Sequence, residues 1–422
     1  MKATIIPGYI YGSLTAPPCK SHTQRAYAAA LLHVGQTIIR NAGHSGDERA
    51  ALQVIQHLGA RVSVKDVLEI TSTGVNPISN AINCGESGLA ARLFTPIAAI
   101  CGEQLLIEGT GSLLRRPMEG FSEILPSLNV AMEGFNGYLP FKVRGPMQAR
   151  PISIDAGNGS QFLSGLLFAL SAVTKEPLTL EVTNLKSKPY IDLTLEVLAH
   201  FGKPVSHKNY RQFYIDPALF VHKETIEISI EADWSSAAYF LVAGAIAGNM
   251  AIKNLQTGSK QADKAILEAL RMAGAEITTD NNCISVQKSR LQPFDFNATD
   301  APDLFPVLSI LAACCGGESS IAGVHRLFYK ESNRVESITE MLQDFAVPFS
   351  VEDDTLFVTG MPHLQGTIID AYSDHRIVMA ASVGALRANG PVEIPGVEAV
   401  NKSYPGFFDD FISHGGRYTL NI

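Results

Sequence analysis

The chain alternates short runs of β-branched and leucine residues with helical segments of two kinds. One kind is apolar almost all round, as in residues 162–173, 237–248, 304–315 and 377–386. A helix without a polar face has to be buried. The other kind keeps a polar face, as in residues 335–345. The pattern predicts an α/β protein in which one set of helices lies inside and another lies nearer the solvent.

The same unit recurs six times along the chain: a strand, a polar loop, an amphipathic helix, a turn residue and another strand. The turn residues after the six helices are Gly59, Asn129, Gly202, Gly274, Ala346 and Gly415. They are 69 to 73 residues apart, which is more regular than chance recurrence of helix, turn and strand would give. With the apolar helix included, each unit reads as a βαβαββ module. Six modules cannot easily share one core, so we expect two lobes of three modules.

Composition and charge narrow the class of protein. The 422 residues are 46% hydrophobic and 18% charged, with a net charge of −8, which excludes a disordered chain and argues against a nucleic-acid partner. The six cysteines have no metal-binding spacing, so we expect reduced thiols and no metal site. No apolar stretch reaches the ~20 residues of a membrane span. The start of the chain has no apolar leader segment, and we expect a cytoplasmic protein without a membrane partner.

Four cations stand in the first turns of otherwise apolar helices: Lys20, Arg25, Arg92 and Arg376. A cation at the positive end of a helix is unfavourable by about 0.3–1 kcal/mol. It becomes favourable where an anion binds, because helix N-termini and arginine forks both hold phosphate. Further cations stand in loops before the outer helices, where solvated loop charges are the simpler alternative. Repetition in several modules favours a binding site for a small molecule with several negative charges.

Other polar residues at helix starts have a simpler explanation. Ser235 and Ser236 are explained by capping of the helix that follows them. Asp303 and Glu331 stand among cations, where carboxylates can do acid–base work. They are equally well read as a cap and a salt bridge, and these residues alone leave both readings open. The chain has no convincing P-loop, dinucleotide fingerprint, zinc motif or nucleophile elbow.

Several short segments, in order and at matching spacing, resemble one family from end to end. The family is that of the 3-phosphoshikimate 1-carboxyvinyltransferases (EPSP synthases), which are enolpyruvyl transferases. The resemblance is carried by Lys20-Ser21 with Arg25, Arg116-Pro117, Gly159-Ser160-Gln161-Phe162, Ser187-Lys188-Pro189-Tyr190, Asp233 with Ser235-Ser236, Pro302-Asp303, Lys330-Glu331 with Arg334, Asp374-His375-Arg376 and Asn401-Lys402-Ser403.

The resemblance implies a two-lobed, inside-out, barrel-like α/β fold with six βαβαββ repeats, three in each lobe. Residues 1–18 and 230–422 would form one lobe, and residues 19–229 would form the other. The active site would lie in the cleft between the lobes. The resemblance also implies a monomer without a metal or organic cofactor.

The implied reaction transfers the enolpyruvyl group of phosphoenolpyruvate to the 5-hydroxyl of shikimate 3-phosphate and releases phosphate, a step toward chorismate and the aromatic amino acids. The resemblance implies Asp303, Glu331, Lys20 and His375 as catalytic residues. The residues implied for shikimate 3-phosphate are Lys20, Ser21, Arg25, Ser160, Gln161, Ser187, Tyr190, Asp303 and Lys330. Those implied for phosphoenolpyruvate are Lys20, Gly88, Arg116, Gln161, Arg334, Arg376 and Lys402.

The chain departs from the family pattern at four places. Pro18-Cys19 replaces the usual Gly-Ser, and Glu86-Ser87-Gly88-Leu89 replaces Asn-Ala-Gly-Thr. Gly159 stands where a serine often contacts the substrate phosphate, and Arg326 stands where an asparagine often contacts the ring. None of these changes removes the implied acid, base or phosphate ligands, so an active enzyme is expected.

Two other functions remain open. A sister enolpyruvyl transferase acts on UDP-N-acetylglucosamine, but it carries a reactive cysteine near the position of residues 113–116, where this chain has none. A non-catalytic anion-binding relative is the other possibility. The presence of Lys20, Asp303, Glu331, Arg376 and Lys402 argues against it.

Overall fold

The computed structural model describes residues 1–421. Across these residues the chain forms twelve α-helices, several short 3-10 turns and twenty-three strands. The helices are α1 (Lys20–Leu32), α2 (Gly46–His57), α3 (Gly88–Ala98), α4 (Phe121–Ser127), α5 (Gln161–Val173), α6 (Lys188–His200), α7 (Trp234–Ala247), α8 (Ile266–Met272), α9 (Phe305–Ala313), α10 (Arg334–Asp344), α11 (His375–Ala385) and α12 (Phe407–Ser413).

The strands are short and form six small sheets. They are β1 (Lys2–Ile6), β2 (Ile10–Thr15), β3 (Gly35–Arg40), β4 (Arg61–Val64), β5 (Leu68–Ser72), β6 (Ala81–Asn83), β7 (Gln104–Glu108), β8 (Ala131–Glu133), β9 (Phe141–Arg144), β10 (Ile152–Asp155), β11 (Leu178–Thr183), β12 (Val205–Lys208), β13 (Gln212–Ile215), β14 (Thr225–Ser229), β15 (Gly248–Lys253), β16 (Glu276–Asp280), β17 (Cys283–Gln287), β18 (Asp295–Asn297), β19 (Glu318–Ala322), β20 (Phe349–Glu352), β21 (Thr355–Thr359), β22 (Val392–Pro395) and β23 (Arg417–Asn421).

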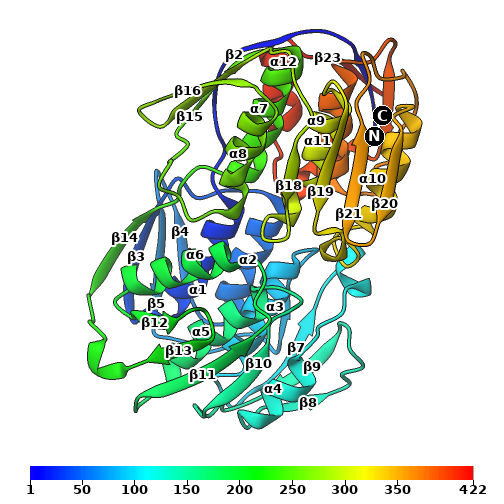
Figure 1. Ribbon diagram of the computed structural model, residues 1–422. Coiled ribbons are helices and arrows are strands. Elements are labelled where there is room, and N and C mark those ends of the chain that lie inside the picture. The colour runs from blue at the N-terminus through cyan, green and yellow to red at the C-terminus, as the bar shows by residue number, and fades with distance from the viewer. Residues whose placement is uncertain (422) are drawn as a thin grey trace. The chain divides into compact units, whose positions relative to one another are not determined.

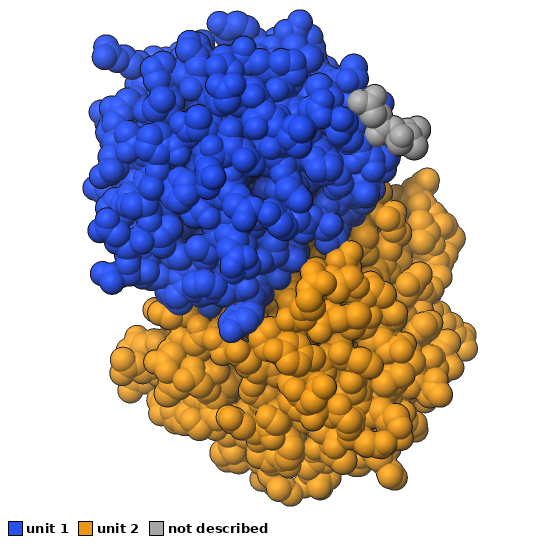
Figure 2. Space-filling view, turned by 90° about the vertical axis from the view of Figure 1, so that its right-hand side faces the viewer, with its two compact units in different colours: residues 1–17, 231–422 blue, residues 18–230 orange. Residues whose placement is uncertain are grey.

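The chain divides into two compact units (Figures 1 and 2). Unit 1 comprises residues 1–17 and 231–422, and unit 2 comprises residues 18–230. Each unit holds three of the six sheets. The chain therefore leaves unit 1 after its first two strands, builds all of unit 2, and returns.

Three of the sheets repeat one topology, which confirms the βαβαββ module. In the sheet β6-β7-β9-β8, the first two strands are parallel and the other neighbours are antiparallel. Sheets β10-β11-β13-β12 and β18-β19-β21-β20 have the same order and directions. A buried helix joins the parallel pair because parallel strands need a long crossover connection. Each sheet is open at both edges, and the sheets stay separate.

Two modules exchange their first strands where the chain passes between the units. Strand β2 precedes α1 in sequence but pairs in parallel with β15. Strand β14 precedes α7 but pairs in parallel with β3. Each exchanged strand supplies the position that the first strand of a regular module takes, so both sheets keep the common order. Unit 1 is thus completed by β2, which precedes the passage of the chain into unit 2. Unit 2 is completed by β14, which precedes the return to unit 1.

The sixth sheet is a variant closed by the N-terminal strand. Strand β1 lies between β22 and β23 and is antiparallel to both. Where the other sheets have a first strand, this sheet has a parallel bridge between Ile368 and Glu393. The sixth repeat thus keeps the common strand order, although the place of its fourth strand is taken by β1 from the start of the chain.

The apolar helices lie inside each unit, as predicted from the sequence. All residues of α7 are buried, and the same holds for α9 and α11. Helices α1, α3 and α5 pack against one another in unit 2, and α7, α9 and α11 do so in unit 1. Gly165 permits the closest of these contacts, since a Cβ there would lie 2.6 Å from the Arg92 carbonyl oxygen. Among the described residues, no helix is both long and apolar enough to cross a membrane.

Candidate active site

The N-terminal ends of four helices of unit 2 are tied together by polar side chains. These ends carry the predicted residues Lys20, Ser21 and Arg25 on α1, Gly88 on α3, Ser160 and Gln161 at α5, and Ser187 and Tyr190 at α6. The ties are Ser87 Oγ to Gln24 Oε1 at 3.2 Å, Arg92 Nη1 to Gln161 Oε1 at 3.1 Å, and Arg25 Nε to Thr194 Oγ1 at 2.9 Å. We call these predicted residues, with Arg92 and Arg116, the unit 2 cluster.

Arg25 is the most deeply buried cation of the unit 2 cluster, with 1% of its surface exposed. Besides Thr194 Oγ1, it donates to the Ser21 carbonyl at 2.9 Å, the Tyr190 carbonyl at 3.3 Å and Ser164 Oγ at 3.4 Å. Its Cζ atom lies 5.7 Å from the centre of the Tyr190 ring. All four acceptors are neutral. Burial lowers the pKa of Arg25 to about 10, so the guanidinium stays charged at neutral pH.

Gly88 allows an arginine to lie against the start of α3. A Cβ at Gly88 would lie 2.7 Å from the guanidinium of Arg116, which is itself buried. The space beside Gly88 is therefore filled by the Arg116 side chain, and the role of Gly88 at a phosphoenolpyruvate site stays a prediction. Arg92 donates to the Gly88 carbonyl at 3.2 Å and to the Pro117 carbonyl at 2.7 Å. Two arginines are thereby held on either side of this helix start.

Lys20 begins α1 and pairs with a carboxylate that sequence reasoning missed. Lys20 Nζ lies 2.8 Å from Asp47 Oδ2, and the two side chains are 15% and 10% exposed. Asp47 lies in the first turn of α2, where Ser45 and Glu48 form a capping box. Capping alone explains an acid at such a position. The contact of Asp47 with Lys20 could therefore not be predicted from the sequence.

Ser160 and Ser187 are the residues before the first turns of α5 and α6. Both are buried. Ser187 adopts a left-handed backbone conformation with φ of 55°, which a residue with a Cβ rarely takes and which costs about 1–3 kcal/mol. Strain of this kind persists where the surroundings fix the backbone. Ser187 is thus held firmly at the helix start beside Tyr190.

In unit 1, Asp303 lies among three predicted cations. Arg334 Nη1 is 2.7 Å and Lys330 Nζ 3.4 Å from Asp303 Oδ1, and Arg376 Nη2 is 3.0 Å from Asp303 Oδ2. Burial opposes ionisation of the carboxyl. Arg376, Lys330 and Arg334 outweigh it and hold the pKa of Asp303 well below its usual value. Asp303 is therefore an ionised carboxylate in this arrangement.

Arg334 is fully buried and is shared by three carboxylates. In addition to Asp303, Nη2 lies 2.6 Å from Glu331 Oε2 and Nε lies 2.8 Å from Asp374 Oδ2. Burial works against the charge, but Asp374, Glu331 and Asp303 raise the pKa of Arg334 above its usual value. The role of Arg334 as a phosphoenolpyruvate ligand stays a prediction.

His375 is the first residue of α11, and Lys402 is hydrogen-bonded to the turn before this helix. Asp374 caps this helix by accepting from the Arg376 amide at 2.9 Å. His375 Nδ1 lies 3.8 Å from Asp374 Oδ1. Lys402 Nζ donates to the Ser373 carbonyl at 2.9 Å. We call Asp303, Lys330, Glu331, Arg334, Asp374, His375, Arg376 and Lys402 the unit 1 cluster.

Lys330 is a cation of the unit 1 cluster whose pKa is lowered. Burial lowers the pKa of Lys330 to about 8; Asp303 opposes the shift, while Arg334 and Arg326 add to it. Arg326 is one of the departures from the family pattern. Burial lowers its pKa, whereas Asp300 and Asp303 act to raise it. Arg326 therefore adds positive charge to the surroundings of Lys330.

Sequence reasoning was wrong about the cap of α7 and missed a buried acid beside it. The cap is Asp233, whose Oδ1 accepts from the Ser236 amide at 2.7 Å. Ser235 instead forms a short hydrogen bond to Asp263. Burial, and next the charge of Asp303, raises the pKa of Asp263 to about 6. Asp263 lies outside every motif of the sequence, and neither spacing nor pattern could have identified it.

The structure thus brings the predicted residues into two clusters, one in each unit. Both combine helix starts with buried arginines, and the carboxylates belong mainly to unit 1. Among the described residues, no group of three or more His, Cys, Asp or Glu side chains is placed to hold a metal ion. The cations of these clusters can bind anions, and their carboxylates can transfer protons.

Comparison with known sequences gives matches over nearly the full length. The 3-phosphoshikimate 1-carboxyvinyltransferase of Thermococcus kodakarensis is 36% identical over 401 residues, which cover 95% of this chain and 96% of that protein. The protein of the same name from Aeropyrum pernix is 34% identical over 418 residues, or 99% of this chain and 96% of that one.

Solved structures agree with the sequence matches. An EPSP synthase structure from Acinetobacter baumannii superposes with a TM-score of 0.81 at 25% identity, covering 99% of this chain and all of that one. The enolpyruvyl transferase NikO from Streptomyces tendae reaches 0.78 at 16% identity over 99% of this chain and 98% of that one, which shows a shared fold. The sequence model of EPSP synthase (3-phosphoshikimate 1-carboxyvinyltransferase) matches residues 5–411. The chain belongs to the EPSP synthase family.

Proposed function

We propose that the protein transfers the enolpyruvyl group of phosphoenolpyruvate to the 5-hydroxyl of shikimate 3-phosphate and releases inorganic phosphate. Membership of the EPSP synthase family supports this reaction. Two features carry it: an ionised Asp303 that shares Arg334 with Glu331, and a buried Arg25 that has only neutral acceptors. The reaction needs both features, because one substrate proton must be removed while multiply charged anions are held.

Shikimate 3-phosphate is assigned mainly to the unit 2 cluster. Arg25 is buried without a carboxylate among its four hydrogen-bond acceptors, so a substrate anion would supply the missing counter-charge. Ser160, Gln161 and Ser187 supply hydroxyl and amide groups at two helix starts, where anions are favoured. In this proposal Lys20, Ser21, Tyr190, Asp303 and Lys330 are further ligands of shikimate 3-phosphate.

Phosphoenolpyruvate is assigned to cations of both clusters. Lys20, Arg116 and Gln161 would act from unit 2, with Gly88 leaving room for the arginine. Arg334, Arg376 and Lys402 would act from unit 1. Arginine and lysine suit this ligand because charge-assisted bonds to carboxylate and phosphate are about twice as strong as neutral ones.

In the proposed mechanism, the 5-hydroxyl oxygen adds to the second carbon of phosphoenolpyruvate. Asp303 accepts the hydroxyl proton. Glu331 takes up a proton from solvent and then donates it to the methylene carbon, with His375 assisting. The tetrahedral intermediate then expels phosphate, and the methyl group returns a proton to regenerate the double bond. No net oxidation occurs, and the pre-placed cations stabilise the phosphate as it leaves.

The low pKa of Asp303 makes it a weak base as long as three cations surround it. We propose that phosphoenolpyruvate draws Arg376 away from Asp303, because the substrate offers a more negative partner. The basicity of Asp303 would then rise only when the second substrate is in place. This order would keep the hydroxyl proton in place until both substrates are bound.

The same proposal includes a monomeric cytoplasmic enzyme that works without a metal or organic cofactor. Its test is release of inorganic phosphate from phosphoenolpyruvate by the purified full chain in the presence of a chelator. We expect release with shikimate 3-phosphate and none with UDP-N-acetylglucosamine. Release only with the sugar nucleotide would assign the sister activity, and tight binding of shikimate 3-phosphate without release would indicate an anion-binding relative.

A further inference from the structure

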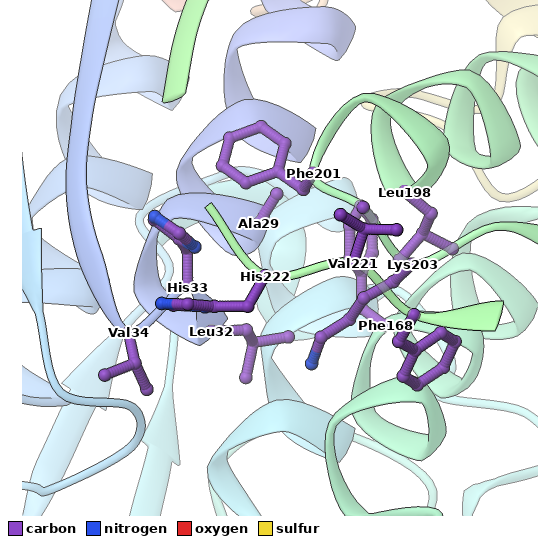
Figure 3. A pocket seen from close by; sticks show the side chains of 12 residues that line it. Ala29, Leu32, His33, Val34, Phe168, Leu198, Phe201, Lys203, Val221 and His222 are labelled. Atoms are coloured by element: carbon purple, nitrogen blue, oxygen red, sulfur yellow. The ribbon is translucent and has the colours of Figure 1, made fainter. Parts of the chain in front are cut away.

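A cavity of about 200 Å³ lies within unit 2, at the carboxyl ends of α1 and α6 (Figure 3). Its floor is apolar and buried, formed by Phe168, Leu198 and Phe201. Its rim carries Val34 and Val221, which are 56% and 59% exposed. The cavity is therefore open to solvent and mostly apolar, with His33, His222 and Lys203 as its polar lining side chains, as is typical of small-molecule sites.

The wall of this cavity is fixed in place. The Val221 amide donates to the Gly202 carbonyl at 2.8 Å. Gly202 has φ of +74°, and a Cβ there would lie 2.0 Å from the Val221 carbonyl oxygen. Only glycine fits this contact, which docks the segment before β14 onto the end of α6. The cavity is thus preformed, and a ligand would not have to order its wall.

One cation projects along this apolar surface. Lys203 Nζ donates to the Ser171 carbonyl at 3.2 Å and lies 5.8 Å from the centre of the Phe220 ring. Figure 3 shows the Lys203 side chain extending from the α6 side of the cavity toward Leu32. Burial lowers the pKa of Lys203. An ammonium has three donors, and a carboxylate in the cavity would both accept one of them and favour the charged form.

We propose that this cavity is a binding site for a small aromatic carboxylate. The aromatic ring would lie among Phe168, Phe201 and Phe220, and the carboxylate would contact the Lys203 ammonium. A dry apolar cavity of about 150 Å³ accommodates benzene. The volume here therefore suits one ring with a short acidic chain.

The site is separate from the unit 2 cluster. The cluster occupies the first turns of α1, α5 and α6, whereas His33, Leu198 and Lys203 lie at or beyond the carboxyl ends of α1 and α6. Helices α1 and α6 each have 13 residues, so their two ends are about 20 Å apart. The proposal therefore does not rest on the proposed enzyme activity.

The test is calorimetric titration of the full chain with phenylacetate and, as a neutral analogue, 2-phenylethanol. We expect one saturable site that prefers phenylacetate by about tenfold or more, the size of one charge-assisted bond. Lys203→Gln keeps a donor for the Ser171 carbonyl and should abolish this preference. Ala29→Leu, which fills the cavity, should weaken both ligands. The exposed Lys175→Gln is the matched control and should bind like the wild type.

Three results would overturn the proposal. The first is no binding of phenylacetate at millimolar concentration. The second is equal binding of the two ligands, which would mark a merely apolar void. The third is a phenylacetate affinity that falls with Arg25→Gln and not with Lys203→Gln, since the anion would then sit in the unit 2 cluster. Because Lys203→Gln leaves the apolar wall intact, the result does not depend on whether Ala29→Leu folds.

Discussion

Arg25 and Arg334 are both buried arginines at the centre of a cluster, but their surroundings are opposite. Arg25 donates to two hydroxyls and two carbonyls, and burial lowers its pKa to about 10. Arg334 is surrounded by Asp374, Glu331 and Asp303, which raise its pKa despite burial. The charge of Arg334 is compensated by carboxylates, whereas Arg25 has only neutral hydrogen-bond acceptors.

This difference suggests a division of labour between the clusters. A buried cation with neutral partners gains most from a bound anion, so the unit 2 cluster is suited to capture substrate. A closed network of ion pairs holds its members in fixed positions without a ligand, so the unit 1 cluster is suited to place an acid and a base.

Loss of the Asp303 carboxylate from the unit 1 cluster should have the largest effect on activity. Asp303→Ala is expected to lower turnover by about 10²–10⁴-fold, the usual contribution of a general base, while shikimate 3-phosphate still binds. The measurement is steady-state phosphate release together with a binding titration. Asp295→Ala, on the exposed strand β18, is the control and should keep full activity. Unchanged turnover of Asp303→Ala would remove this residue from the mechanism.

Breaking the ion-pair network should destabilise unit 1 more than a similar change destabilises unit 2. Asp374→Asn leaves Arg334 buried with less counter-charge and should reduce the free energy of unfolding by about 3–5 kcal/mol. The fluorescence of Trp234, the single tryptophan of the chain, reports unfolding of unit 1 in denaturant because Trp234 is buried there.

The matched change in unit 2 is Asp47→Asn, which breaks a partly exposed pair with Lys20. Its effect on stability, followed by circular dichroism, should be about 1 kcal/mol or less. Equal losses in the two variants would contradict the view that only the unit 1 cluster is a closed network.

The pH dependence of substrate binding should reveal Lys330. Because the pKa of Lys330 is lowered to about 8, its charge is present below that pH and is lost above it. We expect the KM for shikimate 3-phosphate to rise above pH 8, toward about tenfold per pH unit. Lys330→Arg keeps its charge over this range, so its profile should stay flat. A wild-type KM that is constant to pH 10 would exclude a binding role for the Lys330 charge.

Much of the fold could be predicted from local pattern, because a helix that is apolar all round has to be buried. The helix predicted at residues 237–248 is found as α7 and is wholly buried. The exchange of β2 and β14 could not be predicted from the residues. Local pattern shows that a strand forms, but its partner is set by contacts 238 residues away for β2 and 189 residues away for β14.

Some residues of the candidate site could likewise be predicted from the sequence, and others could not. Cations at helix starts conflict with the helix dipole, and this conflict singled out Arg25 and Arg376 from the sequence. The carboxylates Asp47 and Asp374 stand where capping already explains them, so their second role as partners of Lys20 and Arg334 was hidden. Asp263 became visible only through its burial and its contact with Ser235.

The contrast between the two arginines is tested most directly by titrating shikimate 3-phosphate, without phosphoenolpyruvate, into the wild type, Arg25→Gln and Arg376→Gln. The account predicts that Arg25→Gln weakens binding by about 10–100-fold, the loss of a charge-assisted bond of about 1.5–3 kcal/mol. Arg376→Gln should change the affinity by less than about twofold, because its charge is already compensated by Asp303. An Arg376→Gln loss as large as that of Arg25→Gln, or full affinity in Arg25→Gln, would contradict the account.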